Sequence, residues 1–292
     1  MKVLVFGKYL DKGNIPFVEK VLEDLKGKAV YRINDVFATE LMKQDMDVPV
    51  ELIISNSDQL REFKPDACIS MGGDGTILTA STLIQELSTP ILGINLGRLG
   101  FLASTERTFI DEAINQLINK EYTVEQRSML SLESNIPIFS EASFALNDFT
   151  LHKRDTSSMV TIHTYLDGEF LNSYWADGII ISTPTGSTGY NLSCGGPIIY
   201  PNSQNFVITP VAPHNLTVRP LVVSSTTTIQ LEIEGRSDNF MCTLDSRYET
   251  VTSEHKLSLT ECPFNTQLIR LSNNSFLDTI RNKLAWGRDS RN

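Results

Sequence analysis

The chain is organised around the stretch ISMGGDGTIL, residues 69–78. An apolar run that fits a short buried strand leads into a turn with three glycines and one acid, and helical spacing follows over residues 76–87. Glycines let the backbone approach a bulky ligand closely, because no Cβ stands in the way. The N-terminus of the following helix would favour an anion, so the stretch predicts a phosphate site at Gly72, Gly73 and Gly75.

Asp74 is the unusual residue of this turn. A carboxylate among phosphate-binding amides repels the ligand, unless it binds a metal ion or accepts the proton of a hydroxyl that attacks phosphorus. The structural alternative is a tight strand-to-helix turn in which Asp74 caps the helix. The stretch is neither a Walker motif, because no Lys-Ser/Thr pair follows at the required spacing, nor a G-x-G-x-x-G motif.

The five residues GGDGT, 72–76, resemble the signature of the NAD kinases and, more loosely, that of the diacylglycerol kinases and the phosphofructokinase-like group. The motif alone does not choose among them. Residues 95–102, NLGRLGFL, follow the next expected strand and resemble a second NAD kinase segment. A loop that ends in core residues would explain this segment equally well.

Composition excludes several classes of function. The chain has 292 residues, 41% of them hydrophobic and 21% charged, which is typical of a globular protein with one large or two moderate domains. A net charge of −10 disfavours nucleic acid and anionic membranes as partners. The four cysteines and four histidines show no metal-binding spacing, so we expect no structural metal. No signal peptide or membrane-spanning run is present, so we expect a cytoplasmic protein.

Strand and helix patterns alternate through the first part of the chain. The pattern predicts strands at 2–6, 29–33, 52–55, 67–71 and 90–94, and helices at 17–25, 76–87 and 109–118. This alternation predicts a Rossmann-like α/β domain with a parallel sheet, and the resemblance implies its phosphofructokinase-like form. Ligands of such sheets bind beyond the carboxyl ends of the strands, where the glycine turn would lie.

The sequence changes character near residue 126. Residues 127–268 are rich in Thr, Val, Ile, Ser and Tyr with regular turn signals, which predicts antiparallel strands in a layered or sandwich arrangement. A helical pattern returns over 275–286, and the resemblance implies that this helix docks back onto the first domain. We therefore predict a nucleotide-binding α/β domain of residues 1–126 and 269–292, and a β-rich dinucleotide-binding domain of residues 127–268.

Two segments of the second domain suit a dinucleotide. Asn147 beside Asp148 offers an amide and a carboxylate for ribose hydroxyls, although Asn-Asp is equally a turn dipeptide. Residues 177–193, DGIIISTPTGSTGYNLS, form an apolar strand that opens into a loop of hydroxylated residues and glycines suited to phosphate. Tyr190 offers a flat face for a base. A Gly-Ser-Thr loop without a ligand is the structural alternative.

The loop strengthens the resemblance. Residues 183–190, TPTGSTGY, match an NAD kinase segment at seven of eight positions, with Gly189 where the family has Ala. The resemblance implies that the dinucleotide is bound by Asn147, Asp148, Asp177, Thr188, Gly189, Tyr190, Asn191, Leu192, Ser193, Ala212 and Arg247.

This chain also departs from the family pattern. Asp148 stands where Glu is usual, and Asp245-Ser246-Arg247 stands where many members have Asp-Gly-Gln, so a contact from Arg247 would be ionic. Thr79 and Trp175 stand where some members have basic residues. A divalent cation would therefore have to neutralise more of the phosphate charge.

The resemblance implies an NAD kinase, which transfers the γ-phosphoryl group of ATP to the 2′-hydroxyl of the adenosine ribose of NAD and gives NADP. It implies Asp74 as the general base, Mg²⁺ accompanying ATP, and a homodimer or homotetramer. A diacylglycerol-kinase-like enzyme for a lipid or another small alcohol, and a sensor that binds NAD or NADP without turnover, are the alternatives.

Overall fold

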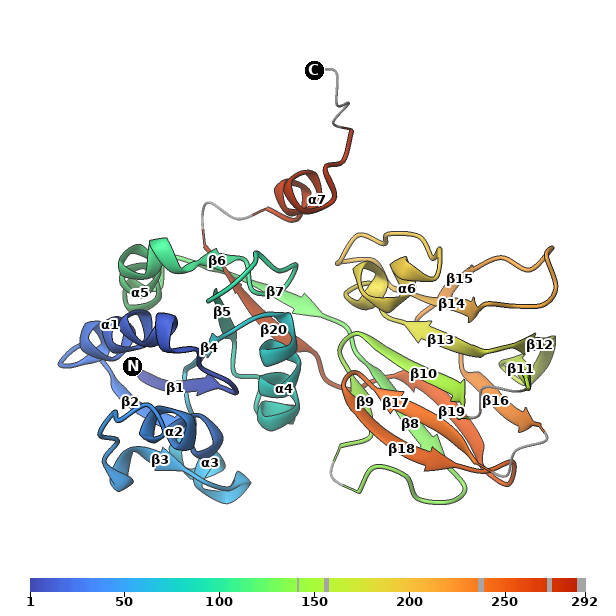
Figure 1. The fold of residues 1–292 in the computed structure, drawn as a ribbon, viewed down its shortest axis with the longest axis horizontal. Coiled ribbons are helices and arrows are strands. Elements are labelled where there is room, and N and C mark those ends of the chain that lie inside the picture. The colour runs from blue at the N-terminus through green and yellow to red at the C-terminus, as the bar shows by residue number, and fades with distance from the viewer. Residues whose placement is uncertain (141, 155–157, 236–238, 272–274, 288–292) are drawn as a thin grey trace. The chain divides into compact units, whose positions relative to one another are not determined.

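The computed structural model describes residues 1–140, 142–154, 158–235, 239–271 and 275–287. The chain divides into two compact units, which are shown with their elements in Figure 1. Unit 1 contains residues 1–126 and 266–292, and unit 2 contains residues 127–265. Within the described ranges, no helix is long and apolar enough to cross a membrane.

A mainly parallel sheet forms the centre of unit 1. Its order in the described residues is β3 (Ile53–Ile54), β2 (Val30–Asn34), β1 (Lys2–Gly7), β4 (Ala67–Met71), β5 (Ile91–Asn95), β20 (Thr266–Arg270) and β7 (Thr123–Arg127), with β6 (Thr105–Glu106) beside β5. β1 pairs in parallel with both β2 and β4, so the strand order reverses there. Ligands of such sheets bind beside this reversal, at the carboxyl ends of the strands.

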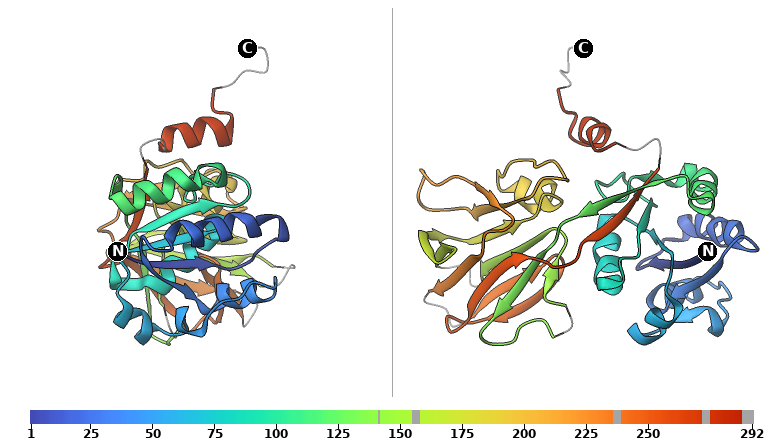
Figure 2. Two further views of the ribbon diagram at one scale, coloured as in Figure 1. Left: turned by 90° about the vertical axis from the view of Figure 1, so that its left-hand side faces the viewer. Right: turned by 180° about the vertical axis from the view of Figure 1, so that it is seen from behind.

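Helices pack on the sheet through apolar faces. They are α1 (Ile15–Leu25), α2 (Asp35–Met42), α3 (Ser57–Phe63), α4 (Asp74–Ile84), α5 (Ile110–Asn119) and α7 (Phe276–Leu284), with short 3-10 turns at Lys12–Asn14, Val50–Leu52, Gln85–Leu87 and Arg107–Phe109. α1 and α5 lie side by side (Figures 1 and 2). Val18 of α1 and Ile114 of α5 share one core with Val5 and Ile69 of the sheet, which fixes the strand that leads to the glycine turn.

Unit 2 is a sandwich of two antiparallel sheets, each six-stranded in the described residues. The first has the order β15 (Leu221–Ser224), β14 (Asn205–Val211), β13 (Gly178–Ser182), β10 (Asp148–Lys153), β17 (Phe240–Leu244) and β18 (Arg247–Val251). The second has the order β12 (Glu169–Ala176), β11 (Val160–Leu166), β16 (Ile229–Glu234), β19 (Lys256–Glu261), β8 (Leu130–Ser134) and β9 (Phe144–Ala145). Phe149 and Ile181 of the first sheet share a core with Ile162 and Leu231 of the second.

The predicted fold class is confirmed: an α/β unit with a parallel sheet, a β-rich unit, and a C-terminal helix that belongs to the α/β unit. The helix after the glycine turn begins at Asp74 instead of Thr76 and ends at Ile84. The polar segment before β4 contains α3, which the strand and helix patterns did not predict. The sequence does contain a signal for α3, because Asn is a preferred N-cap residue. In the structure, Asn56 caps the helix and accepts the backbone N–H of Gln59.

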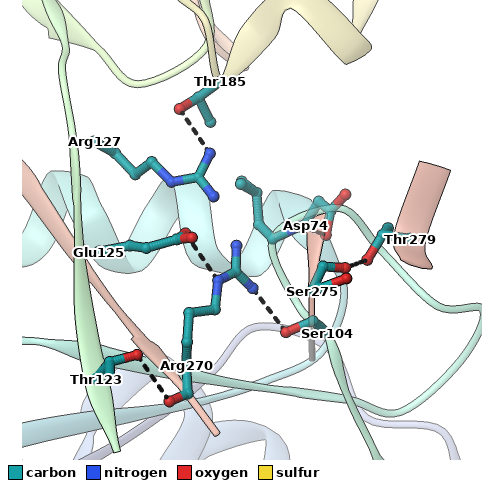
Figure 3. A network of polar contacts seen from close by, with 10 residues as sticks. Asp74, Ser104, Thr123, Glu125, Arg127, Thr185, Arg270, Ser275 and Thr279 are labelled. Atoms are coloured by element: carbon teal, nitrogen blue, oxygen red, sulfur yellow. Dashed lines mark hydrogen bonds and ion pairs between the residues drawn. The ribbon is translucent and has the colours of Figure 1, made fainter. Parts of the chain in front are cut away.

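The return of the chain to unit 1 also differs from the sequence prediction. It comes at Thr266 instead of residue 269, because β20 pairs in parallel with β5. Arg270 at the end of β20 binds the carboxylate of Glu125 through Nε at 2.9 Å and donates to Oγ of Ser104 at 2.7 Å (Figure 3). A strand as well as a helix therefore closes unit 1.

Candidate functional site

The glycine turn follows β4 in unit 1 and combines close packing with open backbone. Gly72 has φ 155°, and a Cβ there would lie 2.2 Å from Oγ1 of Thr76, so this position requires glycine. A Cβ at Gly73 or Gly75 would meet nothing within 4 Å. The space beside these two glycines is therefore open, and a ligand at the N-terminus of α4 can approach their backbone closely.

Asp74 does not cap the helix, so the structural alternative is wrong in this respect. The cap residue is Gly73, and Asp74 is the first residue of α4. Its carboxylate instead accepts backbone N–H groups from residues far along the chain: Phe101 donates to Oδ2 at 2.8 Å, and Leu102 and Ala103 donate to Oδ1 at 3.0 and 2.9 Å. The segment of residues 95–102, which resembles a second NAD kinase motif, thus ends against the carboxylate of Asp74 in the glycine turn.

Gly100 makes this approach possible. A Cβ on Gly100 would lie 1.8 Å from Oδ1 of Asp74. Lys283 of α7, which the sequence analysis did not single out, places Nζ 3.8 Å from Oδ2. No motif marks Lys283, because only the docking of α7 brings it to the carboxylate.

Asn147 and Asp148 are held in place in unit 2 by Asp245. Its carboxylate accepts the backbone N–H groups of Leu146, Asn147 and Asp148 at 3.0, 2.7 and 3.3 Å. The side-chain Oδ1 of Asn147 is buried and accepts no hydrogen bond from the described residues. A buried amide oxygen without a partner is costly, and a ligand hydroxyl would satisfy it.

Asp148 is a buried acid next to a second one. Burial, together with the charge of Asp245, raises the pKa of Asp148 to about 7. Burial also raises the pKa of Asp245, against the lowering effect of the three amides that it binds. A protonated Asp148 can donate as well as accept a hydrogen bond, which suits a ribose hydroxyl.

The loop after β13 is joined to Asn147. Thr183 donates its backbone N–H to the carbonyl of Asn147 at 2.9 Å, and a Cβ on Gly186 would lie 2.1 Å from the same oxygen. A Cβ on Gly189 would lie 3.9 Å from Oδ2 of Asp148. Two segments that the sequence analysis assigned to the dinucleotide therefore meet within unit 2.

Buried hydroxyls of this loop stabilise the loop itself. Oγ of Ser187 donates to the carbonyl of Pro184 and accepts the N–H of Ile199, so it does not point to a ligand. Asn191 is fully buried and accepts a hydrogen bond from Oγ1 of Thr209 at 2.6 Å. Tyr190, in contrast, is 41% exposed, so its ring is accessible to a base.

Asp177 and Ala212 lie at the ends of paired strands in unit 2. Asp177 forms an ion pair with Lys153 at 2.5 Å, and its backbone N–H binds the carbonyl of Val211. Ala212 has φ 44°, a left-handed conformation that is unusual for alanine. Lys153 carries no sequence signal for a site, because only the pairing of β10 with β13 brings it to Asp177.

Comparisons with known proteins match the whole chain. Residues 7–122 match the family described as the ATP-NAD kinase N-terminal domain, and residues 146–271 match the ATP-NAD kinase C-terminal domain. The NAD kinase of Cytophaga hutchinsonii is 46% identical over 98% of both chains, and that of Flavobacterium psychrophilum is 44% identical over the full length of both. This chain belongs to the NAD kinase family.

Solved structures of NAD(H) kinases share the fold. Yeast NADH kinase complexed with NADH has a TM-score of 0.85 at 23% identity, covering 99% of this chain and 89% of that one. An NAD kinase from Archaeoglobus fulgidus in complex with ATP has a TM-score of 0.75 at 24% identity, covering 98% and 99%. The resemblance predicted from the motifs is thus confirmed at the level of family and fold.

The departures from the NAD kinase pattern have local structural roles. Arg247 donates to the backbone carbonyls of Ala142 and Phe144, and its guanidinium lies 5.6 Å from the ring of Phe144. Its ionic contact with a dinucleotide stays a prediction. Thr79 donates to the carbonyl of Gly75 within α4.

Trp175 lies on the surface of unit 2. Half of its side chain is exposed, and its ring lies 4.3 Å from that of His214, centroid to centroid. Neither Thr79 nor Trp175 supplies the positive charge that some members of the family have at these two positions.

Proposed function

We propose that this member of the NAD kinase family phosphorylates the 2′-hydroxyl of the adenosine ribose of NAD with ATP. The observation that carries the proposal is the full-length likeness to curated NAD kinases, together with the glycine-turn aspartate that this family motif contains. The 2′-oxygen forms a bond to the γ-phosphorus, the bond from that phosphorus to the bridging oxygen breaks, and ADP leaves. The hydroxyl proton passes to a carboxylate.

Asp74 is the carboxylate in this proposal. An ionised carboxylate has about four acceptor positions, and three are used by the amides of Phe101, Leu102 and Ala103. The remaining position is on Oδ2, which accepts one amide, whereas Oδ1 accepts two. Three backbone bonds fix the direction of this lone pair before substrate binds, which is the kind of positioning that a general base needs.

The backbone of the glycine turn is proposed to bind the phosphates. Gly73 and Gly75 leave the N-terminus of α4 open, and the amides and dipole of that helix favour an anion. Gly72 sets the shape of the turn. Binding of this kind supplies alignment and charge stabilisation, which account for most of phosphoryl-transfer catalysis.

Unit 2 is proposed to bind NAD. The unpartnered Oδ1 of Asn147 and the buried Asp148 would receive ribose hydroxyls, and Tyr190 would contact a base. Further contacts of NAD are proposed at Asp177, Thr188, Gly189, Asn191, Leu192, Ser193, Ala212 and Arg247. The side chain of Asn191 is already hydrogen-bonded to Ser187 and Thr209. We therefore expect it to support NAD binding by holding the loop in place.

A divalent cation, Mg²⁺, is proposed to enter with ATP. Within the described residues, no group of three or more His, Cys, Asp or Glu side chains could hold a metal ion. In this proposal Mg²⁺ is carried by substrate phosphates and water, as is usual for this ion. When bound, Mg²⁺ would neutralise phosphate oxygens. A cytoplasmic location and assembly into a homodimer or homotetramer also remain predictions.

The deciding experiment incubates the purified chain with MgATP and either NAD or diacylglycerol. We expect NADP to form and the lipid to remain unchanged. Lipid phosphorylation would support the small-alcohol kinase, and NAD binding without turnover would support the sensor.

The role of Asp74 is tested by Asp74→Asn, which should lower kcat by about 100- to 10,000-fold, the usual contribution of a general base. NAD binding, measured by calorimetry, should persist, and near-native turnover in this variant would contradict the role of Asp74.

A further inference from the structure

The C-terminal helix α7 docks on the residue whose backbone binds Asp74. Phe101 donates its N–H to Oδ2 of Asp74, and its ring packs at 6.3 Å from that of Phe276 at the start of α7. Near the other end of α7, Nζ of Lys283 lies 4.7 Å from the centre of the same ring. Both ends of the helix are therefore positioned relative to the acid by one side chain.

Lys283 faces the oxygen of Asp74 that keeps a free acceptor position. Its Nζ is 3.8 Å from Oδ2, which is an ion-pair distance, longer than a hydrogen bond. About a third of each side chain is exposed, 34% for Lys283 and 29% for Asp74, so a ligand can reach both. The ammonium retains donors for other acceptors, since it has three N–H groups.

Charge balance makes this cation important. A triphosphate that binds at the glycine turn brings several negative charges beside the ionised Asp74, and such a pair repels without a cation. Thr79, one helical turn from Gly75, carries no charge, and its hydroxyl is bonded to the helix backbone. Among the described residues, Lys283 is the basic residue that forms an ion pair with Asp74.

We propose that Lys283 binds the transferred phosphoryl group. Its ammonium lies near Oδ2 of Asp74. From there it would donate to the phosphoryl oxygens of a bound nucleotide and leave the free lone pair of Oδ2 to the substrate hydroxyl. Lys283 takes no proton in this step. This inference rests on the proposed function and assigns to α7 the positive charge that the glycine turn lacks.

The test compares Lys283→Met, Lys283→Arg and Arg281→Met in the full-length chain. The methionine keeps the apolar stem over Phe101 but removes the charge. Arg281 lies on the same helix, pairs with Asp278 and is 55% exposed, so Arg281→Met is a control with the same change in net charge. Steady-state kinetics with ATP varied and NAD saturating, and the reverse, give kcat and both KM values. Binding of a non-hydrolysable ATP analogue, measured by calorimetry, is a readout without turnover.

We expect Lys283→Met to lower kcat/KM for ATP by about 10- to 100-fold, because charge-assisted hydrogen bonds to phosphate are strong. The KM for NAD should change less than about twofold, and Lys283→Arg should restore most of the loss because it keeps the charge. Arg281→Met should match the wild type. Equal activity of Lys283→Met and wild type, an equal loss in Arg281→Met, or no rescue by arginine would overturn the inference.

The two proposals can fail separately. If the wild type forms no NADP, the proposed function is wrong, and the affinity of the ATP analogue for wild type and Lys283→Met still tests the lysine. Weaker analogue binding in Lys283→Met alone supports the phosphate contact, and unchanged binding contradicts it.

Discussion

Substitution of Gly100 by alanine tests whether Asp74 is positioned by the second glycine-rich segment. The new Cβ would lie 1.8 Å from Oδ1 of Asp74 and 2.6 Å from its Cγ, whereas an ordinary contact begins at 3.4 Å. The new methyl group is fixed to the backbone and cannot rotate away. The carboxylate of Asp74 must therefore move by roughly 1.5 Å to restore an ordinary contact distance. Such a shift separates it from the amides of Leu102 and Ala103, which bind Oδ1.

The size of the effect follows from these bonds. A hydrogen bond to a charged group contributes about 1.5 to 3 kcal/mol, so the loss of two would cost about 3 to 6 kcal/mol if nothing replaced them. Since Asp74 is 29% exposed, water can replace part of this, and we expect the free energy of unfolding to fall by roughly 2 to 3 kcal/mol. A displacement of this size should lower kcat by about 100-fold.

Gly97→Ala is the matched control in the same segment. A Cβ there would meet only Oδ1 of Asn95, at 4.0 Å, and the backbone N–H that binds this oxygen is retained. NADP formation at saturating substrates and urea-induced unfolding should be measured for both variants. If Gly100→Ala keeps kcat and stability within the range of Gly97→Ala, the 101–103 amides do not set the position of Asp74.

Two further predictions concern unit 2. Gly186→Ala should weaken NAD binding at least tenfold, because its Cβ would lie 2.1 Å from the carbonyl oxygen of Asn147. Gly189→Ala is the control: its Cβ would meet nothing nearer than 3.2 Å, so it should weaken NAD binding less. Equal KM values for NAD in the two variants would contradict this prediction. The pKa of Asp148 is about 7 in the folded chain against 3.8 for an ordinary Asp, so the folded state holds a proton that the unfolded state loses as pH rises from about 4 to 7. The free energy of unfolding should therefore fall over that range by up to about 4 kcal/mol. Asp148→Asn should flatten this fall in denaturant titrations at pH 4 to 8, and a parallel fall in the variant would show that Asp148 is not its source.

Much of this protein follows from local sequence. Apolar runs of strand length alternate with helical spacing before residue 126, and that alternation fixed the prediction of a parallel sheet. GGDGT and TPTGSTGY carried the resemblance that the full-length comparisons confirm. These signals are local because strand period, helix period and glycine conformation depend on residues that are neighbours in the chain.

The failures of local reasoning also have a common origin. Asp74 was weighed as a helix cap from its neighbours, but its partners are 27 to 29 residues away. The domain boundary was placed by composition after residue 268, which cuts through β20, whereas the pairing of β20 with β5 and the ion pair of Arg270 place the whole strand in unit 1. Composition does not reveal which sheet a strand joins, because both sheets bury the same kinds of side chain.

By itself, the sequence determined the two kinds of sheet, the glycine turn and the family of this protein. Only the tertiary structure decided which backbone amides hold Asp74, that Asp245 fixes the Asn147 segment, and that a lysine of the last helix faces the acid. The reason is physical: a carboxylate binds amides or an ammonium by direction and distance in space. Those quantities are set by strand pairing and helix docking between residues that are far apart in the chain.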